Sequence, residues 1–108
     1  MNVAYPERDV YENFKPVEDA YFFKLGSKGL VSFYGRNYTI KRKLSAEEQT
    51  SLLKHPCFVR VAHQCYANKE KISALENQML LFQDKESYPK TLNVAPWLQR
   101  HVKKQLSH

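Results

Sequence analysis

The sequence predicts a mainly β fold with two short helices, built as a single domain. Short runs of aromatic and β-branched residues recur along most of the chain, and residues that favour turns separate them. Only two segments carry a recognisable helix start. The length of 108 residues, with 43% hydrophobic residues, is enough for one compact core and too short for a second folded module.

The N-terminal part of the chain differs from the rest. Residues 1–18 are polar and aromatic without a clean period, and Pro6 and Pro16 interrupt any helix there. We therefore expect a leader, or one extra edge strand, over residues 1–18. The folded domain is predicted to cover residues 19–108.

A hairpin and a third strand are predicted next. The runs over 20–25 and 30–34 are rich in aromatic residues, and the glycine-bounded segment 26–29 between them predicts the turn. The run over 37–43 alternates, so that its odd and even positions point to opposite faces. One face carries Tyr38 and Ile40, and the other carries Thr39, Lys41 and Lys43.

Two helices are predicted from their start signals. Ser45 and Glu48 fit a capping box, and the helix they begin ends before the His55-Pro56 pair. Pro96 is suited to the first position of the last helix, over residues 97–106, because that position needs no amide hydrogen. Between the two helices, short β-runs lie over residues 57–61, 71–75, 79–82 and 88–92.

The charge of the chain is strongly positive and unevenly distributed. Seventeen Lys and Arg against 11 Asp and Glu give a formal net charge of +6. Residues 1–19 hold two basic and five acidic residues, a net of −3, which leaves a net of +9 for the rest of the chain. A partner rich in negative charge is therefore the first expectation.

Membrane insertion, secretion and catalysis find little support in the sequence. It holds no apolar run of membrane-spanning length and begins without a signal-peptide pattern, so we expect a cytoplasmic protein. Phosphate-binding glycine loops, nucleophile elbows and embedded carboxylate pairs are lacking, which favours a protein that is not an enzyme and needs no cofactor.

A zinc site is the one metal centre that the sequence suggests. His55 and Cys57 are followed by His63 and Cys65, with alternating side chains that a Cys₂His₂ site would require. Structural zinc usually uses ligand pairs held by tight knuckles, however, and Cys57 stands in an apolar run where a free cysteine acts as a small hydrophobic residue. The sequence therefore favours two free thiols and no metal.

Basic and amide side chains between the strands form the remaining signal. Cations bind phosphates, and amides and guanidinium groups match the edges of bases in pairs. The candidate nucleic-acid-binding residues are Lys28, His63, Gln64, Asn68, Lys69, Lys71, Asn93 and Arg100. Each of them taken singly is also an ordinary solvated surface residue.

The segment 58–72 resembles the LytTR family of bacterial DNA-binding domains. Phe58, Arg60, Asn68 and Ile72 match the family pattern Phe-x-Arg-x-His-x-Ser, three apolar residues, Asn, and Ile four residues later. The similarity extends over about residues 19–106. The sequence departs from the pattern at Ala62, at Gln64 and at Ala95-Pro96-Trp97, which stand where the family has His, Ser and a Ser-Arg pair.

The resemblance implies an elongated fold in which loops enter successive major grooves of promoter DNA, often at paired direct repeats and as a dimer on DNA. Asn68 would then read a base, and Lys28, His63 and Gln64 would lie on adjacent loops. Lys69 and Lys71 would hold phosphates. Asn93 and Arg100 are the candidates for the downstream Ser-Arg pair, whose equivalent the sequence leaves open.

The sequence leaves two functions open. The first is a bacterial transcription regulator that resembles response regulators. It would be either a stand-alone protein without a receiver domain, controlled by a protein partner such as a small membrane inhibitor, or an isolated domain of a longer chain. The second is a protein-interaction module or antagonist that keeps the fold without reading bases. In the second case Trp97 would serve as an interface anchor.

Overall fold

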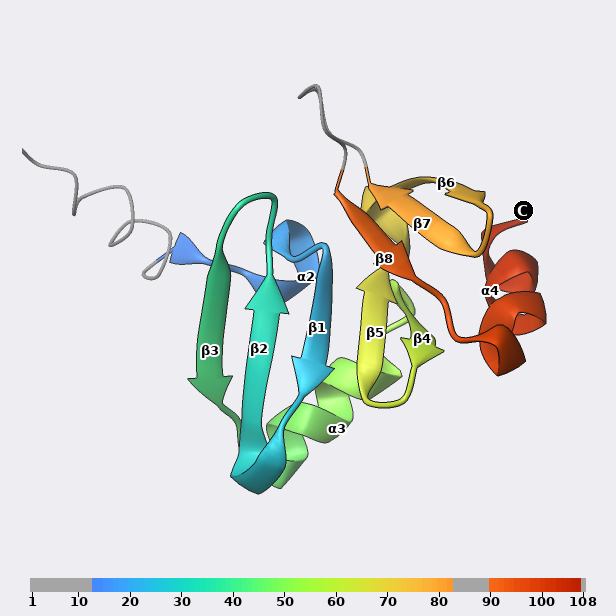
Figure 1. Ribbon diagram of the computed structural model, residues 1–108. Helices are drawn as coiled ribbons and strands as arrows, with labels where there is room; N and C mark the ends of the chain where they lie inside the picture. The colour runs from blue at the N-terminus through green and yellow to red at the C-terminus, as the bar shows by residue number, and fades with distance from the viewer. Residues whose placement is uncertain (1–12, 83–89, 108) are drawn as a thin grey trace, which may run out of the picture.

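The computed structural model describes residues 13–82 and 90–107 as two antiparallel sheets with helices packed against them (Figure 1). One sheet has five strands in the order β3-β2-β1-β5-β4, and the other has three in the order β6-β7-β8. The first comprises β1 (Phe22–Leu25), β2 (Leu30–Tyr34), β3 (Thr39–Lys43), β4 (Phe58–Ala62) and β5 (Cys65–Asn68). The second comprises β6 (Ile72–Glu76), β7 (Met79–Phe82) and β8 (Thr91–Asn93). The mainly β prediction is confirmed.

Helices and single turns connect the strands. The α-helices are α2 (Pro16–Asp19), α3 (Ala46–Lys54) and α4 (Gln99–Leu106), and the 3₁₀ turns are η1 (Ser27–Gly29), η2 (Lys69–Lys71) and η3 (Pro96–Leu98). The two predicted helices correspond to α3 and α4. None of the helices in the described part of the chain is long and apolar enough to cross a membrane.

The predicted hairpin is formed by β1 and β2, which pair from Phe22 with Tyr34 to Leu25 with Val31. The chain reverses in η1, where Lys28 and Gly29 both adopt positive φ. Gly29 is required there, because a Cβ atom at this position would lie 2.7 Å from the carbonyl oxygen of Leu44.

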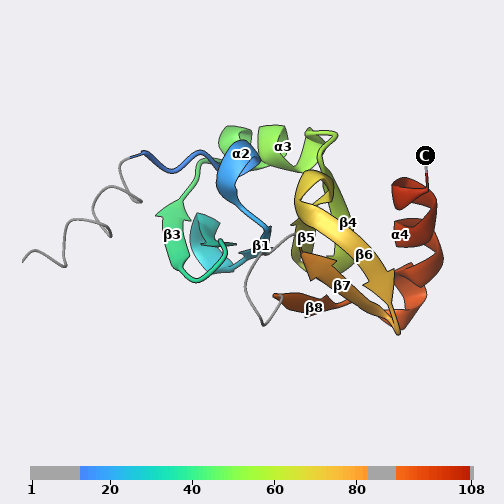
Figure 2. The same cartoon turned by 90° about the horizontal axis from the view of Figure 1, so that it is seen from above.

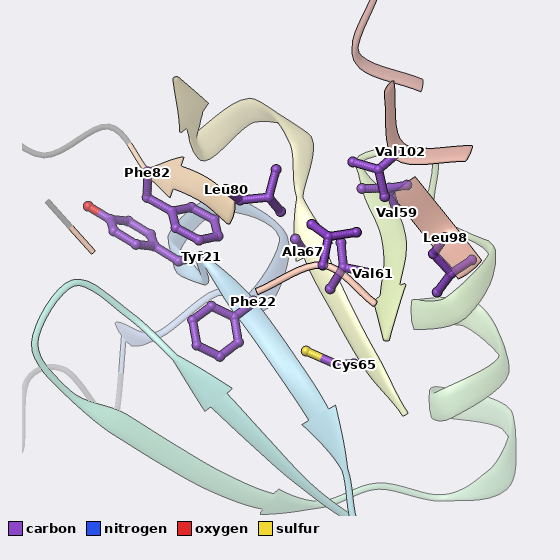
Figure 3. Packing of buried hydrophobic residues seen from close by; sticks show 11 residues of the cluster. Tyr21, Phe22, Val59, Val61, Cys65, Ala67, Leu80, Phe82, Leu98 and Val102 are labelled. Atoms are coloured by element: carbon purple, nitrogen blue, oxygen red, sulfur yellow. The ribbon is translucent and has the colours of Figure 1, made fainter. Parts of the chain in front are cut away.

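The five-stranded sheet has a separate core on each face. In Figure 2, α2 and α3 lie on one side of it, and the three-stranded sheet lies on the other. The core beneath the helices contains Phe14, Phe23, Phe33, Ile40, Leu52 and Phe58. The core between the two sheets, shown in Figure 3, contains Tyr21, Phe22, Val59, Val61, Ala67, Leu80, Phe82 and Val102. Side chains along β1 alternate between the two faces, so that Phe22 packs in one core and Phe23 in the other.

The start of α3 confirms the capping box. The Glu48 amide donates to Ser45 Oγ at 3.1 Å, and the Ser45 amide donates to Glu48 Oε1 at 2.8 Å. Leu52 then places the helix on the core beneath it. The third-strand prediction is confirmed as well, because Ile40 is buried while Thr39, Lys41 and Lys43 are exposed.

Some elements differ from their predicted bounds. β5 was not predicted as a separate strand, and the last helix begins at Gln99, after the η3 turn, rather than at residue 97. Phe14, within the predicted leader, is buried in the core beneath α3. The extra edge strand proposed for residues 1–18 falls largely on residues 1–12, which lie outside the described residues, as do Tyr88 and Pro89 of the predicted strand 88–92.

Candidate nucleic-acid interface

Two of the predicted loops lie side by side at one end of the five-stranded sheet. The antiparallel pairing of β1 with β5 brings the end of β1 to the start of β5, and the Leu25 amide donates to the carbonyl oxygen of Gln64 at 2.9 Å. Lys28 in η1 therefore stands at the same end as His63 and Gln64 in the β4–β5 turn. Both turns appear along the lower border of Figure 1.

The β4–β5 turn presents two exposed polar side chains. Ala62 pairs with Cys65, so the hairpin reverses through His63 and Gln64 alone. Gln64 has a φ of 60°, a left-handed conformation that costs a non-glycine residue free energy. Such a tight reversal leaves both side chains pointing away from the sheet, where they are accessible to a ligand.

A third loop joins this end of the sheet from β8. The Val94 amide donates to the carbonyl oxygen of Gln78 at 2.9 Å, and the Ala95 amide donates to that of Val61 at 2.8 Å. The second bond fastens the segment before η3 to the end of β4, which leads into the β4–β5 turn. We call η1, the β4–β5 turn and η3 together the loop edge.

Trp97 in η3 is the most prominent side chain of the third loop. It is 62% exposed, the largest value among the large hydrophobic residues described. The guanidinium carbon of Arg60 lies 5.1 Å from the centre of its ring, a cation–π distance. Arg60 Nε is buried and makes no hydrogen bond, so the guanidinium group interacts with the Trp97 ring instead of with a hydrogen-bond acceptor at this atom. Arg60 thus supports Trp97 rather than facing solvent alone.

Asn93 and Arg100 flank the same loop. Asn93 is exposed at the end of β8, opposite Met79, and Arg100 is exposed in the first turn of α4. Val102 of α4 is buried against β4, which fixes the helix next to η3. The structure therefore places Lys28, His63, Gln64, Asn93 and Arg100 on the loop edge or on residues adjoining it.

Lys69 and Lys71 lie at the opposite end of the sheet. β5 runs away from the β4–β5 turn and leads into η2, and its four residues span about 13 Å. Lys69 lines a groove of about 360 Å³ between β6 and the C-terminal part of α4, where Lys103 and Leu106 face it. These two lysines are therefore not brought together with the residues of the loop edge.

Asn68 is buried, which corrects the expectation that it reads a base. Its side chain is 0% exposed, and Nδ2 donates to the carbonyl oxygens of Val17 at 2.9 Å and Ala20 at 3.0 Å. Oδ1 accepts from the Glu70 amide at 3.0 Å and so caps η2. These three hydrogen bonds hold the segment before β1 against the end of β5. Because the side chain is fully buried, it is not accessible to a base.

The two cysteines face different cores. Cys57 belongs to the core beneath α3 and Cys65 to the core between the sheets, so their thiols point to opposite faces. Burial raises the pKa of Cys65 to about 11 and also raises the pKa of Cys57, so both are protonated at neutral pH. Among the described residues no three His, Cys, Asp or Glu side chains come together as metal ligands would.

The comparisons with known proteins concern the fold. No protein-family model matches the sequence, and no characterised protein matches it significantly. A LytTr DNA-binding domain from Bacillus cereus is similar in structure, with a TM-score of 0.59 over 87% of this chain and 86% of that chain, at 18% sequence identity. The chain therefore has a LytTR-like fold, as its resemblance to the family implied.

Proposed function

We propose that this chain binds double-stranded DNA through the loop edge, with sequence preference, and acts as a transcription regulator. The observation that carries the proposal is the alignment of three loops along one edge of a fold that a LytTr DNA-binding domain shares. The net charge of +6 supports it, because binding to DNA depends largely on neutralising phosphates.

The shape of the molecule suits loops rather than a recognition helix. The molecule is flat, with extents of 45, 38 and 22 Å, and its two longer dimensions exceed one turn of B-DNA, about 34 Å. A row of loops along a body of this width can therefore meet successive grooves on one side of a duplex. Both longer helices have buried residues that hold them against the cores, Leu52 in α3 and Val102 in α4.

Roles follow from position on the loop edge. We assign base contacts to His63 and Gln64, because both can donate and accept hydrogen bonds and the tight turn projects them. Lys28 is assigned to a phosphate at one side, and Asn93 and Arg100 to the other side. Asn68, which is buried, and Lys69 and Lys71, at the far end, are left out of this interface.

The test begins with selection of genomic fragments by the purified protein. Binding of a selected and a scrambled duplex is then compared across a salt series for the wild type and for the double variant His63→Ala/Gln64→Ala. Losing two base contacts, each contributing about 1 to 3 kcal/mol, should reduce the preference for the selected duplex by at least 10-fold. Ser51→Ala, exposed on α3 outside the three loops of the loop edge, is the control and should leave the preference intact.

A wild-type protein that binds both duplexes equally, or neither, would contradict the proposal. If binding is specific, footprints on the selected fragments also test the arrangement expected from the resemblance. Two protected half-sites and two protein chains per duplex would support paired direct repeats and a dimer on DNA.

The exposure of Trp97 favours a second function, the binding of a protein partner. An indole ring that is 62% exposed and backed by a guanidinium group is a typical interface anchor. Under this alternative, Trp97→Ala would abolish partner capture while His63→Ala/Gln64→Ala would leave it unchanged. Both functions would hold if this chain binds DNA and is controlled by a regulatory protein. In that case Trp97→Ala would lose partner binding and keep DNA preference, whereas His63→Ala/Gln64→Ala would lose DNA preference and keep partner binding.

A further inference from the structure

Among the residues that the structure describes, none covers the β2–β3 half of one face of the five-stranded sheet. On that face the three-stranded sheet packs against β4, β5 and β1, through Val59, Ala67 and Phe22 among others. Figure 2 shows that β3 lies away from this second sheet, and in Figure 1 the strands β3 and β2 stand clear of it. The uncovered area carries Lys24, Leu30, Ser32, Tyr34, Thr39, Lys41 and Lys43, which we call the lysine face.

The register of the strands groups three lysines on this face. Lys24 is opposite Ser32, and Ser32 is opposite Lys41, so these three residues form one row across the sheet. Strands are about 4.8 Å apart, which places the Cα atoms of Lys24 and Lys41 about 10 Å from one another. Lys43 follows Lys41 on the same face, about 7 Å further along β3.

No described carboxylate neutralises the lysine face. None of its seven residues is acidic, and its three lysines form no ion pair with any residue that the structure describes. Lys24 is held over the ring of Tyr34, with Nζ 5.5 Å from the ring centre. Lys90, which precedes β8, borders the same area with Nζ 5.8 Å from the centre of the Phe22 ring. The area thus attracts a ligand with several negative charges.

The lysine face is continuous with the loop edge. The Leu44 amide donates to the carbonyl oxygen of Gly29 at 2.8 Å, which brings the end of β3 to η1. Lys43 and Lys28 therefore lie at the same end of the sheet, and the positive charge extends from η1 along β3. A polyanion held at the loop edge would pass close to this surface.

We propose that the lysine face is a second contact surface for DNA, which binds the phosphate backbone next to the segment held by the loop edge. The inference rests on the proposed function. Leu30, 41% exposed, is the only large hydrophobic side chain of this face with high exposure. A protein partner would need a cluster of apolar or aromatic anchors, so the surface fits repeated phosphates better than an acidic protein.

The test compares two triple variants that remove the same charge. The first is Lys24→Gln, Lys41→Gln and Lys43→Gln. The matched control is Lys15→Gln, Lys54→Gln and Lys104→Gln, three exposed lysines of which the first lies just before α2 and the other two lie on α3 and α4. Equal far-ultraviolet circular dichroism and equal unfolding temperatures check that both variants fold.

Binding to the selected and the scrambled duplex is measured across a salt series. Each lost phosphate contact lowers the magnitude of the slope of log K against log salt by about 0.9. The slope of the first variant should therefore be smaller than that of the control by up to about 2.7. Its affinity for both duplexes should decrease by the same factor, so that the ratio of the two affinities stays at the wild-type value, because phosphate contacts carry no sequence information.

Salt dependence equal to that of the control would overturn the inference. If the first variant also loses binding to poly-glutamate while its DNA binding matches the control, the lysine face receives an acidic protein instead. These results differ from failure of the proposed function, in which the wild type itself shows no preference between the duplexes. The His63→Ala/Gln64→Ala variant gives the opposite pattern, a lost preference with nearly unchanged salt dependence.

Discussion

Replacing Asn68 with alanine removes the side chain that links the segment before β1 to the end of β5. The carbonyl oxygens of Val17 and Ala20 lose their donor, and the Glu70 amide loses its acceptor. Water can replace the partner at Val17, whose residue is 37% exposed. It cannot easily reach Ala20, which is fully buried, so that carbonyl oxygen remains without a partner.

The cost of this replacement follows from the burial of each bond. A partly buried hydrogen bond contributes about 1 kcal/mol, and a buried acceptor left without a partner costs about 1 to 3 kcal/mol. The three losses at Asn68 together give a decrease of about 3 to 5 kcal/mol in the free energy of unfolding. For a domain of this size each kcal/mol lowers the unfolding temperature by roughly 4 °C or more, so a decrease above about 12 °C is expected.

Urea unfolding, followed by circular dichroism, measures the difference, with Asn93→Ala as the control. Asn93 is exposed at the end of β8, so its replacement should change the free energy of unfolding by less than about 0.5 kcal/mol. At a temperature where Asn68→Ala is folded, it should still prefer the selected duplex. An Asn68→Ala protein as stable as the wild type that has lost this preference would show that Asn68 reads a base and would refute the structural role.

Three further predictions concern stability. Ser45→Ala removes the cap of α3 and should cost about 1 kcal/mol in urea unfolding, whereas Ser51→Ala, exposed in the same helix, should cost little. Gly29→Ala should cost about 1 to 3 kcal/mol or more, because a methyl group there combines a positive φ with a close approach to Leu44; wild-type stability would contradict this. Burial raises the pKa of Cys65 from 9.0 to about 11, so the unfolded thiol loses its proton first, and stability should fall by up to about 2 to 3 kcal/mol between pH 9 and 11. Unfolding measured across this range should show a smaller decrease for Cys65→Ala; identical curves would exclude the thiol as its source.

Local signals predicted three of the local elements correctly. The capping box depends on residues three apart, and the alternation of β3 depends on residues two apart, so both are visible in a short window. The β1–β2 hairpin is likewise determined by a short turn between two aromatic runs. The family resemblance supplied the arrangement of these elements, which no local pattern contains.

Asn68 shows where such reasoning fails. An asparagine between strands has the side chain to read a base and equally the side chain to cap a turn. The choice between them depends on Val17 and Ala20, 51 and 48 residues away in sequence, whose carbonyl oxygens the folded chain brings to its amide. Spacing around Asn68 contains no trace of these partners, so its burial could not be predicted from the sequence.

Which basic residues lie together at one end of the sheet is also decided by contacts between residues far apart in the sequence. Lys28 and His63 are 35 positions apart in sequence, yet the pairing of β1 between β2 and β5 brings their turns to one end of the sheet. Lys69, only six positions after His63, is carried to the other end by β5. The direction of a single strand thus decides which lysines can contact the same ligand.

The exposure of the lysine face likewise depends on the whole fold, namely on which strands the second sheet covers. Alternation alone predicted that Lys41 and Lys43 share a face opposite Ile40, and the structure confirms it. Whether that face is solvent-exposed depends on the width of the second sheet. With three strands, it is too narrow to cover all five strands of the first. Because the smaller sheet packs on the β4 side, it leaves the lysines of β3 exposed next to η1. If DNA lies along the loop edge, these lysines stand beside it at the same end of the sheet, and removing them should weaken the binding of every DNA sequence alike.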